Sequence, residues 1–143
     1  MKRPIHQHAI LRVVSKILIP YIFLFALYVQ FHGDFSAGGG FQAGVIFASG
    51  IILYTLIFGL DRAFQAFHPR LFEIFMALGV SIYGGVGVVA LLSGGQFLEY
   101  DSLTHDPVHG QHLGILLVEL GVGLTVTSAM VSIFFAFLNR GRA

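Results

Sequence analysis

Four long apolar stretches, separated by short polar segments, dominate the pattern of this chain. They run over about residues 11–31, 40–60, 71–92 and 112–138. A helix rises about 1.5 Å per residue, so about 20 apolar residues cross a hydrocarbon core of about 30 Å. The pattern therefore predicts an all-α integral membrane protein with four transmembrane helices. Residues 1–143 are expected to form a single membrane domain.

The first apolar stretch also has features of a secretory signal, because basic residues precede it. Phe35 and Ala37 do not offer small residues at both positions of a cleavage site, so the stretch is predicted to remain as a helix. Arg12 and Lys16 lie near its start and can extend to the interface. Pro20 is expected to kink this helix or to lie near its first turn.

The composition agrees with a membrane protein. The chain is 56% hydrophobic and 10% charged, with a mean hydropathy of +0.83, whereas soluble domains carry about 25% charged residues. It has no cysteine, which excludes disulfides and thiolate metal sites. The net charge of +1 argues against nucleic acid as a partner. The length suits one compact bundle without a separate soluble domain.

The basic residues predict an orientation. None of the eight Lys and Arg residues falls in the first or third connection; they are Lys2, Arg3, Arg12, Lys16, Arg62, Arg70, Arg140 and Arg142. Because cytoplasmic segments carry an excess of Lys and Arg, both termini are predicted to be cytoplasmic. The glycine-rich first connection then lies outside, and an even number of spans agrees with this.

The passage from the first connection into the second span is the most distinctive segment. It reads Gly38-Gly39-Gly40-Phe41-Gln42 and is followed by Gly44 and Ala48. Small residues at 40, 44 and 48 share one helix face, where another membrane helix can approach closely. The alternative is a flexible turn that only joins two spans.

Glu119 is the sharpest single signal for chemistry. It lies seven residues into the fourth span among leucine and valine, about 10 Å below the outer interface. A carboxylate at that depth is expected to face a partner or a hydrated cavity. His112, Gly123 and Thr127 share its helix face. Participation in ion movement is the functional hypothesis, and a hydrogen bond that only joins helices is the structural one.

The third span carries Gly84, Gly85 and Gly87. Close helix packing explains them most simply, and a π-bulge over residues 83–87 is the functional alternative. Glu73 lies near the cytoplasmic end of the same span. An exposed interfacial carboxylate is the default interpretation of Glu73, and a place in a proton route is the weaker one.

The histidines of the third connection, His105, His109 and His112, have a spacing that resembles metal ligands on a helix. Pro107 and Gly110 are expected to interrupt that helix, so no metal site is predicted. The chain has no nucleophile and base pair, Walker loop or dinucleotide fingerprint. We therefore expect no enzyme site and no cofactor.

Two motifs together resemble a known family. Gly38 to Gln42 entering a helix, with Glu119-Leu120-Gly121-Val122-Gly123-Leu124-Thr125 in the last span, is similar to the MnhB (MrpB) subunits of the Mrp (Mnh) multisubunit monovalent cation/proton antiporters. The resemblance covers nearly the whole chain. The family usually carries Pro and His where this chain has Ala37 and Asp34, and Ala43 replaces a common Gly. Without the Pro, the loop before the second span is less rigid.

The resemblance implies a subunit of a hetero-oligomeric Na⁺/H⁺ antiporter in a bacterial or archaeal cell membrane. Its partners would be the other antiporter subunits and membrane lipid, and the transported ions would be Na⁺ and H⁺. Glu119 would be the protonatable or cation-facing group, and Gly38 to Gln42 a structural edge of the path. Two alternatives stay open: an equivalent subunit of a membrane-bound hydrogenase or complex I-like redox-driven pump, and a purely structural scaffold.

Overall fold

The structure is a computed structural model that describes residues 9–33, 39–103 and 105–141. Among these residues there are helices and connections and no strand, so the prediction of an all-α protein is confirmed. Four helices are long and apolar enough to cross a membrane. The helical elements are α1 (Ala9–Gln30), α2 (Gly40–Phe58), α3 (Leu60–Ala66), α4 (Pro69–Leu92), the 3-10 helix η2 (Tyr100–Leu103) and α5 (Pro107–Arg140).

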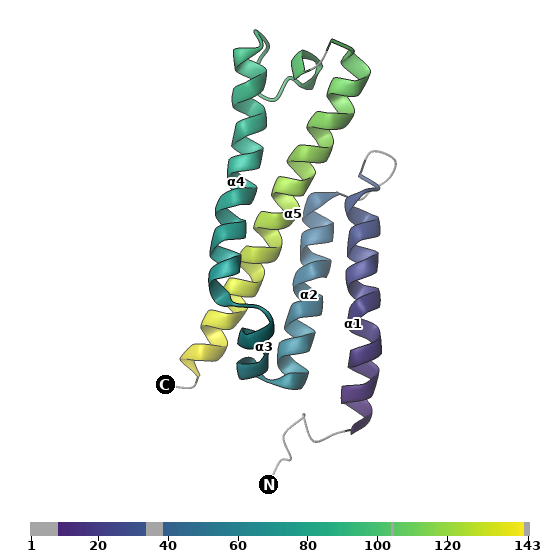
Figure 1. Cartoon of the computed structure of the whole chain (residues 1–143), viewed down its shortest axis with the longest axis vertical. Coiled ribbons are helices and arrows are strands. Elements are labelled where there is room, and N and C mark those ends of the chain that lie inside the picture. The colour runs from purple at the N-terminus through teal and green to yellow at the C-terminus, as the bar shows by residue number, and fades with distance from the viewer. Residues whose placement is uncertain (1–8, 34–38, 104, 142–143) are drawn as a thin grey trace.

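Helix α5 is the centre of the bundle. It packs against α4 on one side and α2 on the other, and α1 packs against α2 (Figure 1). The order across the molecule is therefore α4, α5, α2, α1. The start of α1 and the end of α5 lie at the same end of the bundle, as four crossings require (Figure 1).

The second span is shorter than its apolar stretch predicts. Helix α2 ends at Phe58, because Gly59 takes a φ of 93°, a left-handed conformation that interrupts the helix. The segment expected to be a polar turn instead begins with the short helix α3. Helix α1, by contrast, continues through Pro20.

The fourth membrane-spanning helix, α5, is longer than expected and begins at Pro107 rather than near His112. The side chain of Asp106 accepts a hydrogen bond from the backbone N–H of Val108 (3.1 Å), which caps the helix. Proline suits the first helical position, where its missing N–H has no intrahelical role. The expectation that Pro107 and Gly110 interrupt the helix is therefore wrong.

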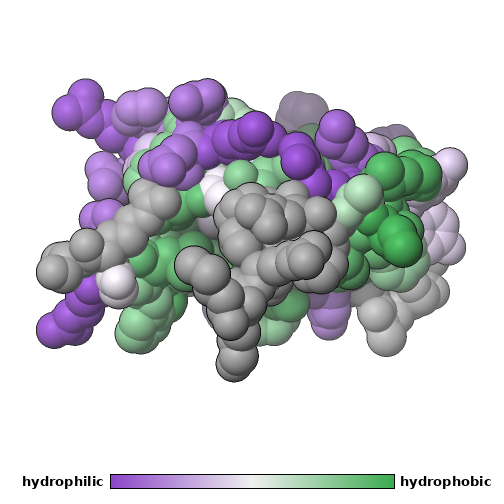
Figure 2. All heavy atoms as spheres, turned by 90° about the horizontal axis from the view of Figure 1, so that it is seen from below, coloured by the Kyte–Doolittle hydropathy of each residue, from purple (hydrophilic) through white to green (hydrophobic). Residues whose placement is uncertain are grey.

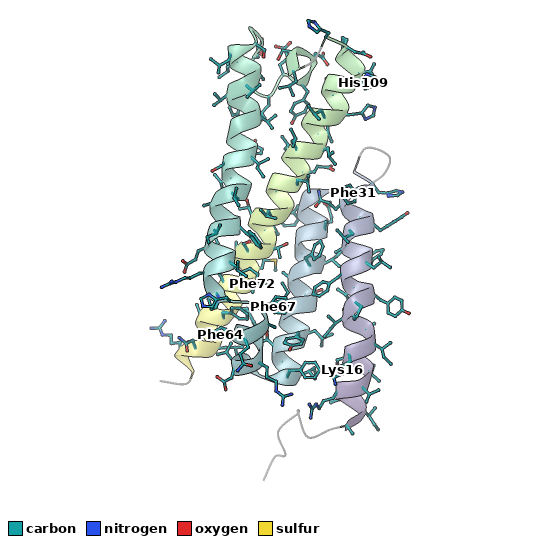
Figure 3. The ribbon with its side chains drawn as sticks, viewed as in Figure 1. Lys16, Phe31, Phe64, Phe67, Phe72 and His109 are labelled. Carbon is teal, nitrogen blue, oxygen red and sulfur yellow. The ribbon has the colours of Figure 1, made fainter. Side chains whose placement is uncertain are left out.

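An aromatic cluster holds α3, α4 and α5 together near the end where α1 begins (Figure 3). The ring of Phe135 lies 5.1 Å from Phe64 and 5.8 Å from Phe72, edge to face in both pairs. Phe72, Phe135 and Val131 are buried in this core. The short helix α3 is thus anchored by its apolar side, which explains why a segment with polar residues is helical.

The same end of the bundle carries the described basic side chains, and Figure 2 shows many hydrophilic residues there. Arg12 and Lys16 of α1 lie over the ring of Phe58 at 5.7 and 6.0 Å. Cations can bind the face of an aromatic ring in this way. The contact fixes the start of α1 against the end of α2.

At the opposite end of the molecule the helices end at two different levels, and we call this difference in level the step (Figure 1). Helices α4 and α5 extend well beyond the ends of α1 and α2 (Figure 1). In Figure 3, His109 on α5 lies far above Phe31 at the end of α1. The inner corner of this step, where α2 begins against α5, is the location of Glu119.

Candidate functional site

The carboxylate of Glu119 lies in space that two glycines leave open. A Cβ atom at Gly33 would overlap the carboxylate itself, and one at Gly39 would lie 2.7 Å from Oε1 of Glu119. The residue is partly buried. Gly33 follows the end of α1 and Gly39 precedes α2, so both of these backbone positions lie directly against the carboxylate of Glu119.

The carboxylate also lies beside the N-terminus of α2. Gly39 is the N-cap residue and makes no side-chain cap, with a φ of 139° that favours glycine. The first N–H groups of a helix have no intrahelical acceptor, and the helix dipole places partial positive charge there. The carboxyl group from α5 therefore lies where the start of α2 would stabilise a negative charge.

Helices α2 and α5 approach each other at backbone distance. A Cβ at Gly40 would overlap the carbonyl oxygen of Glu119, and one at Gly44 would lie 2.8 Å from the carbonyl oxygen of Gly123. The hydroxyl of Thr127 donates to the carbonyl of Gly44 (3.1 Å) and to that of Gly123 (2.8 Å). Ala48, on the same face of α2, is completely buried.

The three residues of α5 that the sequence suggested for an ion path, His112, Glu119 and Thr127, do not form one cluster. Thr127 lies about 12 Å from Glu119 along α5, toward the C-terminal end of the helix, and donates to the α2 backbone. His112 lies about 10 Å from Glu119 in the opposite direction on the same face and is exposed. Since α5 begins at Pro107, Glu119 lies about 18 Å from the start of its helix, deeper in the helix than the sequence suggested.

Gln30 belongs to this region although the sequence pattern did not single it out. Its side chain is 5% exposed, and its Oε1 would lie 2.6 Å from a Cβ at Gly123. Its amide Nε2 is buried and has no hydrogen-bond partner among the described residues. The available signal was a polar residue at the end of an otherwise apolar stretch.

Two aromatic side chains of the third connection pack against glycines of α4 and α5, where the absence of a side chain leaves space. The ring of Phe97 occupies the space beside Gly87, and the ring of Tyr100 occupies the space beside Gly114. Burial raises the pKa of the Tyr100 phenol, and the nearby Tyr83 and Glu119 raise it further. Tyr100 is therefore a neutral group in the electrostatic environment of Glu119.

Two other glycines of α4, Gly84 and Gly85, do not lie at a close contact with another element. A Cβ at Gly84 or Gly85 would have no neighbouring atom within 4 Å. Helix α4 is a regular α-helix through this region, without a π-bulge. The close contact of α4 with α5 occurs instead at Gly79, where a Cβ would lie 2.5 Å from the carbonyl oxygen of Gly121.

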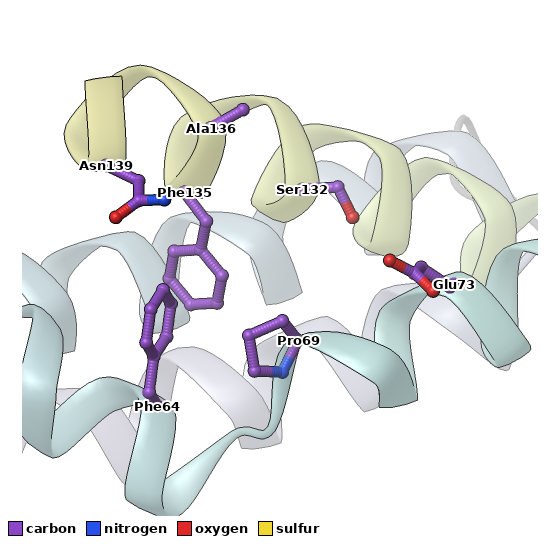
Figure 4. A pocket seen from close by; sticks show the side chains of 7 residues that line it. All are labelled: Phe64, Pro69, Glu73, Ser132, Phe135, Ala136 and Asn139. Carbon is purple, nitrogen blue, oxygen red and sulfur yellow. The ribbon is translucent and has the colours of Figure 1, made fainter. Parts of the chain in front are cut away.

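Glu73 is separate from Glu119. It lines a pocket of about 270 Å³ at the end of the bundle that carries the aromatic cluster (Figure 4). Ser132 and Asn139 of α5 supply the other polar side chains there, and Phe64, Pro69, Phe135 and Ala136 complete the lining. The structure therefore does not bring the two carboxylates together.

His109 and His112 lie in the first turns of α5, not in an irregular connection. His109 Nδ1 lies 2.7 Å from Oδ2 of Asp106, and both side chains are exposed. In the part of the chain that the structure describes, no three His, Cys, Asp or Glu side chains are grouped to hold a metal ion. Asp106 serves as the helix cap in this arrangement.

Comparison with known proteins identifies relatives over almost the whole length. Residues 10–132 match the family model described as a domain related to the MnhB subunit of Na⁺/H⁺ antiporter. Proteins named "Putative antiporter subunit mnhB2" from Staphylococcus aureus strains Newman, JH1 and USA300 are each 32% identical over 137 residues. The aligned region covers 94% of this chain and 96% of each relative. By these matches, the chain belongs to the family of proteins related to the MnhB antiporter subunit.

Proposed function

We propose that this chain is a membrane subunit of a multisubunit Na⁺/H⁺ antiporter and that Glu119 faces the ion path of that complex. The chain is a multi-pass membrane protein whose relatives carry antiporter names over their full length. Those names favour antiport over a redox-driven pump as the activity of the parent complex. The other subunits of the antiporter would supply the remainder of the path.

The position of Glu119 is the observation that supports its role. Its carboxylate lies at the inner corner of the step, against non-helical backbone and the N-terminus of α2. Ionisable groups within membrane spans usually serve ion or proton movement, because an unused charge there is unfavourable. A group in this position can exchange a proton for a cation when the step is hydrated.

A structural role is the second candidate, and one specific contact favours it. The Glu119 carboxylate lies where a helix cap would lie, beside an N-cap glycine that has no side chain of its own. A carboxylate near a helix N-terminus contributes about 0.3–1 kcal/mol to stability. Charge-neutral substitution separates these two roles, as argued below.

Removal of this chain from the complex tests the proposed activity. Everted vesicles from cells that express the remaining subunits are expected to lose Na⁺-dependent proton exchange, measured by dequenching of a pH-sensitive dye. Expression of this chain from a second plasmid should restore exchange. Full Na⁺-dependent exchange without the chain, or exchange that requires an electron donor, would contradict the proposal.

The proposed orientation places the third connection outside the cell. Gln96 and Gln65 are exposed residues of the same type, in the α4–η2 connection and in α3. The chain has no native cysteine, so a single cysteine at either position is unique within it. Gln96→Cys is expected to react with an impermeant maleimide in intact cells, whereas Gln65→Cys should react only after permeabilisation. The reverse pattern would invert the orientation.

A further inference from the structure

A basic pocket lies between α1, α2 and α3, near the end of the bundle where α1 begins. Its volume is about 370 Å³. Its described lining consists of Lys16, Ile19 and Pro20 of α1, Tyr54 and Phe58 of α2, and Arg62 of α3. Figure 3 shows Lys16 beside the end of α2. None of these residues lines the pocket of Glu73 or contacts Glu119, so the proposed ion path does not account for this pocket.

Two cationic side chains line the basic pocket without an acidic partner. Lys16 and Arg62 are both exposed, and neither forms an ion pair with a carboxylate among the residues that the structure describes. Asp61 precedes Arg62 in α3 but is not part of the lining. The guanidinium of Arg12 lies over the ring of Phe58, which adds positive charge at the edge of the pocket. The pocket therefore favours a negatively charged ligand.

The basic pocket lies at a boundary of the membrane. Helix α2 is about 27 Å long, so its last residue, Phe58, lies close to one face of a hydrocarbon core of about 30 Å. Nζ of Lys16 lies 6.0 Å from the centre of the Phe58 ring, at the same level. Pro20 and Tyr54 each lie one helical turn, about 6 Å, further toward the middle of the membrane. The pocket is therefore basic at the boundary and mainly apolar below it.

We propose that the basic pocket binds an anionic glycerophospholipid by its phosphodiester headgroup. The phosphate oxygens accept hydrogen bonds from the ammonium of Lys16 and from the guanidinium of Arg62, whose paired N–H groups match the geometry of a phosphate. The glycerol and the first acyl carbons lie against Pro20 and Tyr54. Basic pockets between membrane helices are known to bind anionic headgroups in this way.

The two halves of the basic pocket distinguish this ligand from other anions. A soluble phosphate would contact the cations but would leave the apolar wall at Pro20 and Tyr54 uncovered. A zwitterionic lipid carries its own ammonium group, which the basic side chains repel. An anionic lipid satisfies both the cations and the apolar wall. The inference is independent of the proposed antiport activity, because it depends only on this pocket and its position at the membrane boundary.

Photocrosslinking from inside the pocket tests the identity of the ligand. A benzophenone amino acid replaces Pro20, which is exposed and lines the pocket. The chain is purified in mild detergent with its associated subunits and reconstituted into vesicles of equal parts of phosphatidylglycerol and phosphatidylcholine. Phosphatidylglycerol adducts are expected to exceed phosphatidylcholine adducts on the order of twentyfold, because each of the two cations contributes about fivefold. Mass spectrometry of the crosslinked peptide gives this ratio.

A pair of double variants tests the role of the two cations. Lys16→Gln with Arg62→Gln is expected to bring the adduct ratio close to parity. Arg70→Gln with Arg140→Gln is the matched control, because it removes the same charge from exposed side chains at the same end of the bundle that do not line the pocket. This control should keep the ratio of the chain that has both pocket cations.

Three results would overturn the proposal. The first is an equal yield of the two lipid adducts in the chain that keeps Lys16 and Arg62, a result that needs no folded charge variant. The second is an adduct with another subunit in place of lipid. The third is loss of the phosphatidylglycerol preference in inorganic phosphate but not in potassium chloride of the same ionic strength, which would identify a soluble anion as the ligand. No readout requires transport, so failure of the antiport proposal leaves this test intact.

Discussion

Glu119→Gln is expected to leave the complex assembled while Na⁺-driven proton exchange falls by on the order of a hundredfold, the low end of effects for a lost acid–base group. Glutamine has nearly the same shape, so it fits the space beside Gly33 and Gly39. It cannot release or accept a proton, and it brings no charge to a cation. The measurement is antiport in everted vesicles, normalised to the amount of assembled complex.

Two further variants distinguish an ion-path role from a structural one. Glu119→Asp retains a titratable group that is displaced by one methylene, so partial activity with a shifted pH profile is expected. His112→Ala removes an exposed imidazole about 10 Å from Glu119 on the same face, toward the start of α5, and should change the pH dependence only mildly. Both effects are expected only if protons or cations pass Glu119.

The structural role predicts a different pattern for the same residue. If the carboxylate only stabilises the start of α2, glutamine should be tolerated, because a neutral amide oxygen also accepts hydrogen bonds. Loss of activity in Glu119→Ala would then follow loss of complex. Exchange at the wild-type rate by the assembled Glu119→Gln complex would reject the ion-path hypothesis for this residue.

Local sequence rules predicted most of the fold. Long apolar stretches predicted four membrane helices, and the structure has four helices of suitable length among its described residues. Boundaries were less predictable where one residue decides them. The conformation of Gly59 ends α2 early, and the Asp106 cap starts α5 before the polar residues that were expected to lie outside it.

The candidate site was less predictable, because its geometry depends on helix pairing. The sequence identified Glu119 as an intramembrane carboxylate, but only tertiary structure places it against Gly33 and Gly39. Gln30 was missed because nothing in its local sequence indicates that α1 brings it to Gly123. The step was also inaccessible to sequence reasoning, since every span has a suitable length and only the register between helices displaces their ends.

Gly44→Leu is expected to prevent normal packing of α2 on α5. A Cβ at this position already lies 2.8 Å from the carbonyl oxygen of Gly123 and 2.9 Å from Cβ of Val126. The carbonyl belongs to the backbone of α5 and cannot move aside as a flexible side chain would. Separation of the helices also removes the 3.1 Å hydrogen bond from Thr127 to Gly44.

The expected loss is about 3 kcal/mol, the upper part of the range for overpacked interiors, or more than about a hundredfold in the properly packed population. Gly85→Leu is the matched control, because a Cβ at Gly85 would have no neighbour within 4 Å. The yield of intact complex on size exclusion should fall sharply for Gly44→Leu and stay near the wild-type value for Gly85→Leu, with both chains inserted in the membrane. A full yield of active complex with Gly44→Leu would mean that α2 and α5 do not pack through this face in the assembled protein. Loss with Gly85→Leu as well would instead show that the open face of α4 is covered by another subunit.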